Sequence, residues 1–96
     1  MLNCRFSKQA DKDIESIHKY TYLNFGQKQA QKYSENLFNK IQSIAKNEIK
    51  GRRTDFIKEG IIKLEVGSHI LLYKEQQNSI LIVRILHKSM DARRHI

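Results

Sequence analysis

The first residues of the chain alternate between apolar and polar side chains. Leu2, Cys4 and Phe6 are separated by single polar residues, which is the period-two pattern of a short strand with one buried face. Ser7 follows, and serine is favoured at a helix start because its hydroxyl accepts a bond from a free backbone N–H. We therefore expect a strand that ends at Ser7, with Cys4 facing the core, and a helix after it.

Two stripes of apolar or small residues follow, each at the spacing of three or four that places side chains on one helix face. The first stripe consists of Ala10, Ile14, Ile17, Thr21 and Phe25. The second consists of Ala30, Tyr33, Leu37, Ile41 and Ile44, widened by Phe38 and Ala45. Gly26 interrupts the pattern between them. Because so little chain separates the stripes, the sequence predicts an antiparallel helical hairpin.

Residues 47–55 form a polar and basic stretch in which Ile49 is the only apolar residue. Its basic members are Lys50, Arg52 and Arg53. Such a stretch between two regions of periodic pattern is typical of an exposed loop. We expect it to be the one long irregular segment of the chain.

The pattern then changes to that of β-strands. Apolar and charged residues alternate over 62–66, and Gly67-Ser68 separates them from the apolar run 70–73. Gly-Ser between two such runs indicates a tight β-hairpin. A polar stretch at 75–79 marks a further turn.

The run 80–86 is apolar except for Arg84, which is typical of a strand covered on both faces, so we expect it in the middle of the sheet. Residues 87–96 are short and polar, and we expect at most one helical turn there. The predicted order is a strand, an antiparallel helical hairpin, a three-stranded antiparallel meander and a short C-terminal tail. This describes a single α+β domain over residues 1–96, with both helices on one sheet face.

Composition narrows the class of protein. The chain is 40% hydrophobic and 29% charged, which suits a folded domain. Cys4 is the only cysteine and there is no signal-peptide or membrane-spanning apolar run, so we expect a cytoplasmic protein without a disulfide. The net charge of +8 and the pI near 9.8 favour an acidic partner: nucleic acid, an anionic membrane surface or an acidic protein.

Familiar catalytic and cofactor motifs are absent from the sequence, which has no glycine-rich phosphate loop, no HExxH and no GxSxG. The histidines are His18, His69, His87 and His95. They do not stand at a recognised ligand spacing, so we expect neither a metal nor a cofactor.

A metal-free ribonuclease is the enzyme hypothesis that the residues allow, since it needs an acid, a base and cations on the phosphate. Its candidate residues are Glu65, His69, Arg84, His87, Arg52 and Arg53. In the simpler interpretation Glu65 faces solvent from a strand, Arg84 pairs with a carboxylate and the loop arginines are solvated. No acid–base pair stands out, so we assign no catalytic residue.

Several runs of the chain together carry a family resemblance. The run from Ser7 to Ile14 is only weakly specific, and more specific are Phe25-Gly26, Gly51-Arg52 and Gly60-Ile61. The strongest match is Val66-Gly67-Ser68-His69, followed by Tyr73, and Val83-Arg84-Ile85-Leu86-His87-Lys88-Ser89-Met90-Asp91. In these runs, and over nearly all 96 residues, the chain resembles the ParE toxins of the RelE/ParE family.

The resemblance implies a RelE/ParE-like fold and the toxin of a type II toxin–antitoxin module. Such a toxin is masked by a ParD-like antitoxin in a hetero-oligomer, and the free toxin poisons DNA gyrase and blocks replication without being an enzyme. The related RelE branch cleaves mRNA in the ribosome and is the first alternative. An inactive homologue that only binds is the second. No membrane partner is implied.

The expected target-binding surface is the tail, because its residues carry the most specific part of the resemblance. The candidates are Arg84, His87, Lys88, Met90, Asp91, Arg93 and Arg94. The basic loop adds Lys50, Arg52 and Arg53. These cations are expected to contact gyrase or the DNA held in its complex. The antitoxin is expected to lay an amphipathic helix beside the hairpin and the sheet.

Overall fold

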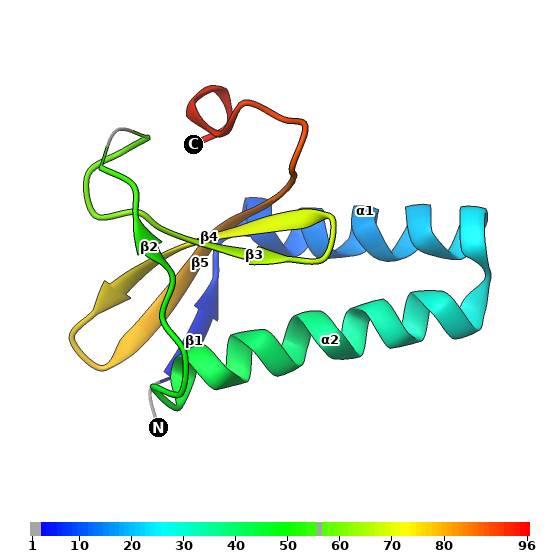
Figure 1. The fold of residues 1–96 in the computed structure, drawn as a ribbon, viewed down its shortest axis with the longest axis horizontal. Helices are drawn as coiled ribbons and strands as arrows, with labels where there is room; N and C mark the ends of the chain where they lie inside the picture. The colour runs from blue at the N-terminus through cyan, green and yellow to red at the C-terminus, as the bar shows by residue number, and fades with distance from the viewer. Residues whose placement is uncertain (1–2, 56) are drawn as a thin grey trace.

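The computed structural model describes residues 3–55 and 57–96, and Leu2 of the expected first strand lies outside them. The described residues form a β-sheet and a helical hairpin, as expected (Figure 1). The elements are β1 Asn3–Phe6, α1 Lys8–Phe25, α2 Gln27–Ala45, β2 Arg52–Arg53, β3 Ile62–Val66, β4 His69–Gln76, β5 Ser79–His87 and a 3-10 turn, η1, Ala92–Arg94. The tail thus contains the single helical turn that its composition allowed.

The sheet has the strand order β1-β5-β4-β3-β2, with β1 parallel to β5 and the other neighbours antiparallel. The expected meander β3-β4-β5 is confirmed. The expectation that residues 80–86 lie in the middle of the sheet is wrong, because β4 holds that place. Both β4 and β5 are covered on both faces, so an apolar pattern cannot tell which of them is central. The edge strand β2, which the sequence did not predict, makes β4 the third of five strands.

Two further expectations about loops need correction. The basic stretch 47–55 is not wholly irregular, because Arg52 and Arg53 pair with β3 and the following Thr54 is buried with its hydroxyl bonded to the Ile61 carbonyl. The polar stretch 75–79 is mostly strand, since β4 runs to Gln76 and β5 begins at Ser79. The pattern predicted a longer turn because the strand residues next to the turn carry polar side chains.

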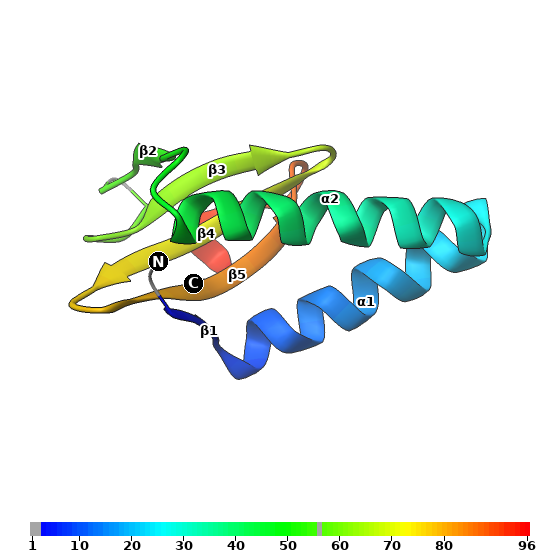
Figure 2. The same cartoon turned by 90° about the horizontal axis from the view of Figure 1, so that it is seen from below.

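Ser7 starts α1 as predicted. Its hydroxyl accepts a hydrogen bond from the Ala10 N–H at 3.0 Å and donates one to the Val83 carbonyl at 2.7 Å, which fixes the helix start to β5. Gly26, with φ of +89°, joins α1 to α2. Both helices lie on one side of the sheet, and the far half of the hairpin projects beyond the sheet's end (Figure 2).

That projection explains why Phe25, the last residue of the first predicted stripe, is 65% exposed. Phe38, beside the second stripe, is 43% exposed although the adjoining Leu37 is 2% exposed, so it is the side of the helix on which it lies, and not the end of the sheet, that leaves it open. The 18 residues of α1 span about 27 Å, and the sheet ends before the hairpin does. Nothing in the periodicity of the stripe reports where the opposing sheet stops.

Two hydrophobic clusters cover the two faces of the sheet. The larger one packs the helices against residues such as Leu71, Tyr73 and Ile82, and Cys4 packs against it from β1 as expected. The smaller one, on the opposite face, consists of Ile61, Ile70, Leu72, Leu86 and Ala92, with Ile57, Val83 and Ile96 packed against it. The tail therefore covers the second face, and β5 is buried on both sides. Over residues 3–55 and 57–96, no helix has the length and apolar character needed to cross a membrane.

Candidate functional site

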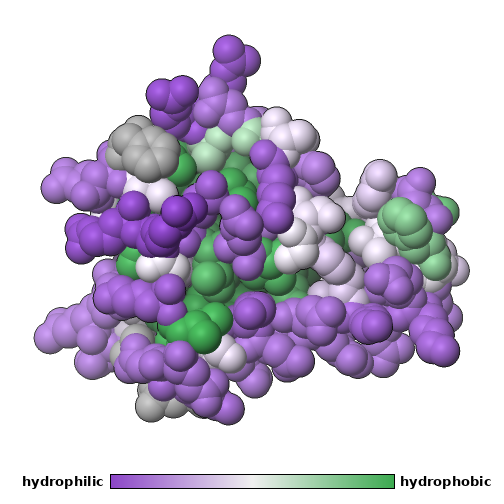
Figure 3. Space-filling model, viewed as in Figure 1, coloured by the Kyte–Doolittle hydropathy of each residue, from purple (hydrophilic) through white to green (hydrophobic). Residues whose placement is uncertain are grey.

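A groove of about 770 Å³ lies between α1, the first turns of α2 and the end of the sheet where β3 turns into β4. Its α1 wall includes Ile17, Tyr20 and Phe25, and its sheet side includes His69 and Met90 from the β4 start and the tail. Tyr20 and Phe25 are 63% and 65% exposed. Figure 3 shows apolar surface over the sheet and again at the hairpin tip, each bordered by hydrophilic residues.

The polar side of the groove rests on an ion pair between α1 and β5. Beyond Ile82, β5 has no neighbour in β1, because β1 ends at Phe6. The Asp13 carboxylate takes that place: it accepts hydrogen bonds from the Ile85 N–H at 2.9 Å and from Arg84 Nε and Nη2 at 2.8 and 2.9 Å. This bond to β5 fixes the start of α1 on the sheet edge.

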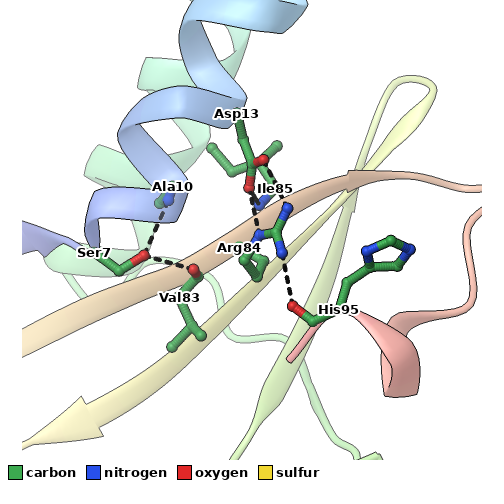
Figure 4. A network of polar contacts seen from close by, with 7 residues as sticks. All are labelled: Ser7, Ala10, Asp13, Val83, Arg84, Ile85 and His95. Atoms are coloured by element: carbon green, nitrogen blue, oxygen red, sulfur yellow. Dashed lines mark hydrogen bonds and ion pairs between the residues drawn. The ribbon is translucent and has the colours of Figure 1, made fainter.

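Arg84 also holds the tail. Its Nη1 donates a hydrogen bond of 2.7 Å to the His95 carbonyl (Figure 4). The side chains of Arg84 and Asp13 are only 16% and 13% exposed, and hydrogen bonding to Asp13 raises the pKa of the guanidinium, which stays charged. The interpretation of Arg84 as the partner of a carboxylate is confirmed, and its donors are committed to internal contacts.

Tyr33 joins α2 to the β3–β4 turn. Its hydroxyl donates to the Val66 carbonyl at 3.0 Å, accepts from the Ser68 N–H at 3.1 Å and lies 2.6 Å from His69 Nδ1. Burial raises the pKa of Tyr33. Gly67 in this turn has φ of +57°, and a Cβ there would stand 2.8 Å from the Tyr33 ring and hydroxyl. The turn that borders the groove is therefore held rigidly against α2.

His69 and His87 lie opposite each other at the ends of β4 and β5, with ring centres 5.4 Å apart. Burial lowers the pKa of His69, and the neighbouring His87 lowers it further, which favours the neutral imidazole. His87 Nδ1 accepts a bond of 3.1 Å from the Ser89 N–H. Sequence spacing gave no sign of this pair, because strand register alone brings the two rings together.

The residues considered for a ribonuclease do not assemble as a set. His69 and His87 meet, but Glu65 pairs with Lys88 at 3.4 Å and Arg84 with Asp13. Arg52 and Arg53 lie on β2, which β3 and β4 separate from β5. Among the described residues that line the groove, the imidazole pair therefore stands without a lysine or arginine, although a phosphate-cleaving site needs cations on the phosphate.

The tail candidates lie together at the end of β5. Met90 lines the groove and is 37% exposed. Asp91 caps η1 through the Arg93 N–H and pairs with the exposed Arg93 and Arg94 at 3.7 and 3.8 Å. His87 shares the groove with Met90, so the tail joins an apolar groove on one side to exposed cations on the other.

The basic-loop candidates lie apart from this group. Lys50 pairs with Glu75 at 3.3 Å and Arg53 with Asp55 at 3.9 Å, all with side chains largely exposed. Sequence analysis overlooked Tyr20, Phe25 and Asp13 as groove residues. Phe25 belongs to the first predicted stripe, and the signal that could have found it and Tyr20 is a helical hairpin longer than its sheet.

Comparison with known sequences places these features in a family. The family model described as the ParE toxin of the type II toxin–antitoxin system parDE matches residues 4–92. Toxin ParE1 of Mycobacterium tuberculosis is 37% identical over 91 residues, which cover 94% of this chain and 93% of the relative. Toxin ParE1 of Caulobacter vibrioides is 32% identical over 92 residues, which cover 96% and 95%.

Solved structures show the same fold. The chromosomal ParDE TA system from P. aeruginosa superposes with a TM-score of 0.75 at 19% identity, covering 91% of this chain and 96% of that chain. The YoeB–YefM complex from Staphylococcus aureus gives 0.59 at 22% identity, covering 91% and 97%. At these identities the likeness concerns the fold alone.

Proposed function

Because this chain belongs to the ParE family of toxins from type II toxin–antitoxin systems, we propose that it inhibits DNA gyrase and so blocks replication. The proposed action needs no covalent chemistry by the toxin. A protein that binds one state of gyrase more tightly than the others raises the population of that state. The proposal places the chain in the cytoplasm, where gyrase and its DNA are.

The observation that carries the proposal is the tail, which presents cations from a fixed position. Arg93 and Arg94 have side chains 66% and 83% exposed, while the preceding Ala92 is buried in the second cluster. Exposed cations on a fixed turn suit an acidic protein surface or a DNA backbone. Arg84 contributes by holding this turn in place. His87 lies on the side of the groove, and Lys88 pairs with Glu65.

We infer that the groove receives a ParD-like antitoxin. Its exposed apolar side chains, Tyr20, Phe25 and Met90, are of the kind that bind the apolar face of an amphipathic helix. The net charge of +8 favours an acidic partner. A helix in the groove would contact Met90 and His87 and so cover part of the tail, which accounts for neutralisation in a toxin–antitoxin hetero-oligomer.

A purified gyrase assay tests the proposed target. Gyrase, plasmid and ATP are incubated with the toxin, and supercoiling and trapped DNA breaks are measured on gels. The variant Arg93→Ala/Arg94→Ala is expected to require at least about tenfold more protein for half-inhibition, the effect of losing about 1.4 kcal/mol of binding free energy. Lys28→Ala/Lys32→Ala removes the same charge from exposed positions on α2 and is expected to inhibit as the parent does. Arg52→Ala/Arg53→Ala tests the basic loop, where we expect a smaller loss.

A second candidate function, cleavage of ribosome-bound mRNA, is favoured by one observation. A neutral His69 beside His87 could divide the roles of base and acid in RNA cleavage. Translating ribosomes with a defined mRNA are therefore the parallel assay. Cleaved mRNA that disappears in a His87→Gln variant would establish this function in place of the first. Silence in both assays together with tight antitoxin binding would indicate a homologue that only binds.

A further inference from the structure

The end of the chain has little stability of its own. η1 is a single 3-10 turn of residues Ala92–Arg94, and short turns of this kind form only when contacts outside the turn fix them. Its outside contacts include packing of Ala92 and Ile96 on the second cluster and the bond from Arg84 to the His95 carbonyl. Packing of Ala92 and Ile96 restricts the position of the tail only loosely, whereas the directional hydrogen bond from a guanidinium also fixes its orientation.

Arg84 can direct the tail because its own orientation is fixed. Both oxygens of Asp13 bind it, and the Ile85 N–H fixes one of those oxygens in turn. The chain of contacts runs from α1 through Asp13 and Arg84 to the tail (Figure 4). If the guanidinium rotated to follow a displaced tail, it would lose two hydrogen bonds to Asp13 and keep only the one to the His95 carbonyl.

The ion pair of Arg84 and Asp13 lies at an otherwise apolar strand. Arg84 interrupts the run 80–86, and a largely buried ion pair is often no more stabilising than well-packed apolar residues in its place. A directional contact that apolar side chains cannot make is the better reason for an arginine here. The Arg84 bond to His95 is that contact.

From these observations we propose that Asp13 and Arg84 are positioning residues for the tail, so that the toxic surface depends on a carboxylate in α1 remote from it in sequence. The functional half of this inference rests on the proposed inhibition of gyrase. The structural half, the order of the tail, does not. Asp13 also lines the groove, so the same carboxylate adjoins the site proposed for the antitoxin.

The experiment measures both halves on the full chain. Hydrogen exchange followed by mass spectrometry reports the amides of Arg94 and His95, which bind the carbonyls of Asp91 and Ala92. Asp13→Asn is expected to speed their exchange about tenfold or more, the usual effect of removing the charged partner of a hydrogen-bonded cation. The concentration for half-inhibition of gyrase is expected to rise by about the same factor. Asp11→Asn, at an exposed position on the same helix, is the matched control and is expected to change neither quantity.

Arg84→Lys keeps the test valid if Asp13→Asn fails to fold. A lysine ammonium keeps a charge beside Asp13 but lacks the fork that reaches both Asp13 and His95. Its melting curve is expected to stay close to that of the parent while tail exchange and gyrase inhibition change as for Asp13→Asn. A purely structural role would shift the melting curve and leave tail exchange in step with the rest of the chain.

The outcomes separate the inference from the function beneath it. Unchanged tail exchange in both folded variants overturns the inference. Faster tail exchange with unchanged inhibition by an active parent overturns its functional half. If the parent itself does not inhibit gyrase, the proposed function fails, and faster tail exchange still supports Asp13 and Arg84 as the residues that order the tail.

Discussion

Gly67 concentrates two constraints at one residue. Its φ of +57° is a conformation that side chains with a Cβ rarely adopt, and the Tyr33 ring fills the space where that Cβ would stand. The hydroxyl of Tyr33 in turn bonds on either side of Gly67, to Val66 and Ser68. The glycine predicted from its place in a hairpin is thus also a point at which the β3–β4 turn contacts α2.

Gly67→Ala is expected to lower the free energy of unfolding by about 2–3 kcal/mol, since positive φ costs about 1–2 kcal/mol and displacement of Tyr33 adds to it. Urea denaturation followed by circular dichroism measures the change. Gly60→Ala is the matched control, because Gly60 has φ of +81° with nothing within 4 Å of its Cβ position. Equal losses in the two variants would show that the Tyr33 contact contributes nothing.

At the scale of elements, the helical hairpin performs two tasks along its length. The half that lies on the sheet buries Leu37 and Ile41 at 2% and 3% exposure, and the projecting half leaves Tyr20 and Phe25 exposed. One amphipathic pattern therefore serves the core at one end and an interaction groove at the other. Apolar residues that no contact within the chain requires are the usual sign of a partner.

Two truncations along the hairpin test this division. Phe25→Ala is expected to change the free energy of unfolding by no more than about 0.5 kcal/mol, as for an exposed site. Leu37→Ala is expected to cost about 2–5 kcal/mol because it leaves a cavity in the core. Thermal and urea unfolding give both values. A loss above about 1.5 kcal/mol for Phe25→Ala would mean that the hairpin tip packs within the chain and is not available to a partner.

At the scale of the whole molecule, the tail belongs to the fold as well as to the proposed site. Ala92 and Ile96 help to cover the sheet face opposite the helices, where Ile61, Ile70 and Leu72 lie. Removing the tail would therefore expose part of a hydrophobic cluster. Loss of toxicity in a truncated protein would not by itself distinguish a missing contact surface from a weakened fold.

A chain ending at His87 is accordingly expected to be less stable than the parent by about 2–4 kcal/mol, the scale of losing the cover of a small cluster. The urea midpoint measures this. Arg93→Ala/Arg94→Ala, which changes exposed side chains only, is expected to keep the parent's midpoint. A truncated chain with an unchanged urea midpoint would show that the tail does not contribute to the stability of the fold.

Local pattern determined much of this protein. The period of two at Cys4 and Phe6, the helical stripes on either side of Gly26 and the turn at Gly67 each reflect side chains close in sequence, so the sequence alone predicted the element order and the α+β class. The stripes could not report where the sheet ends, and Phe25 is therefore exposed although it belongs to the first stripe. Packing partners distant in sequence decide that.

The tertiary structure decided the site through one irregularity in strand pairing. Tyr73 pairs with Ile82, but the preceding Leu72 pairs with Arg84, and the register stays shifted to the end of the hairpin. The bulge adds one residue to β5 and shifts the alternation of its side chains, so that Ile82 and Ile85, three residues apart, both pack on the side of the helices. The run 80–86 is apolar on both faces, and its sequence therefore gives no sign of this shift. The bulge brings His87 opposite His69. Beyond the end of β1, Arg84 of the same strand binds the Asp13 carboxylate of α1. This contact depends on how the helix lies on the sheet, which no local pattern encodes.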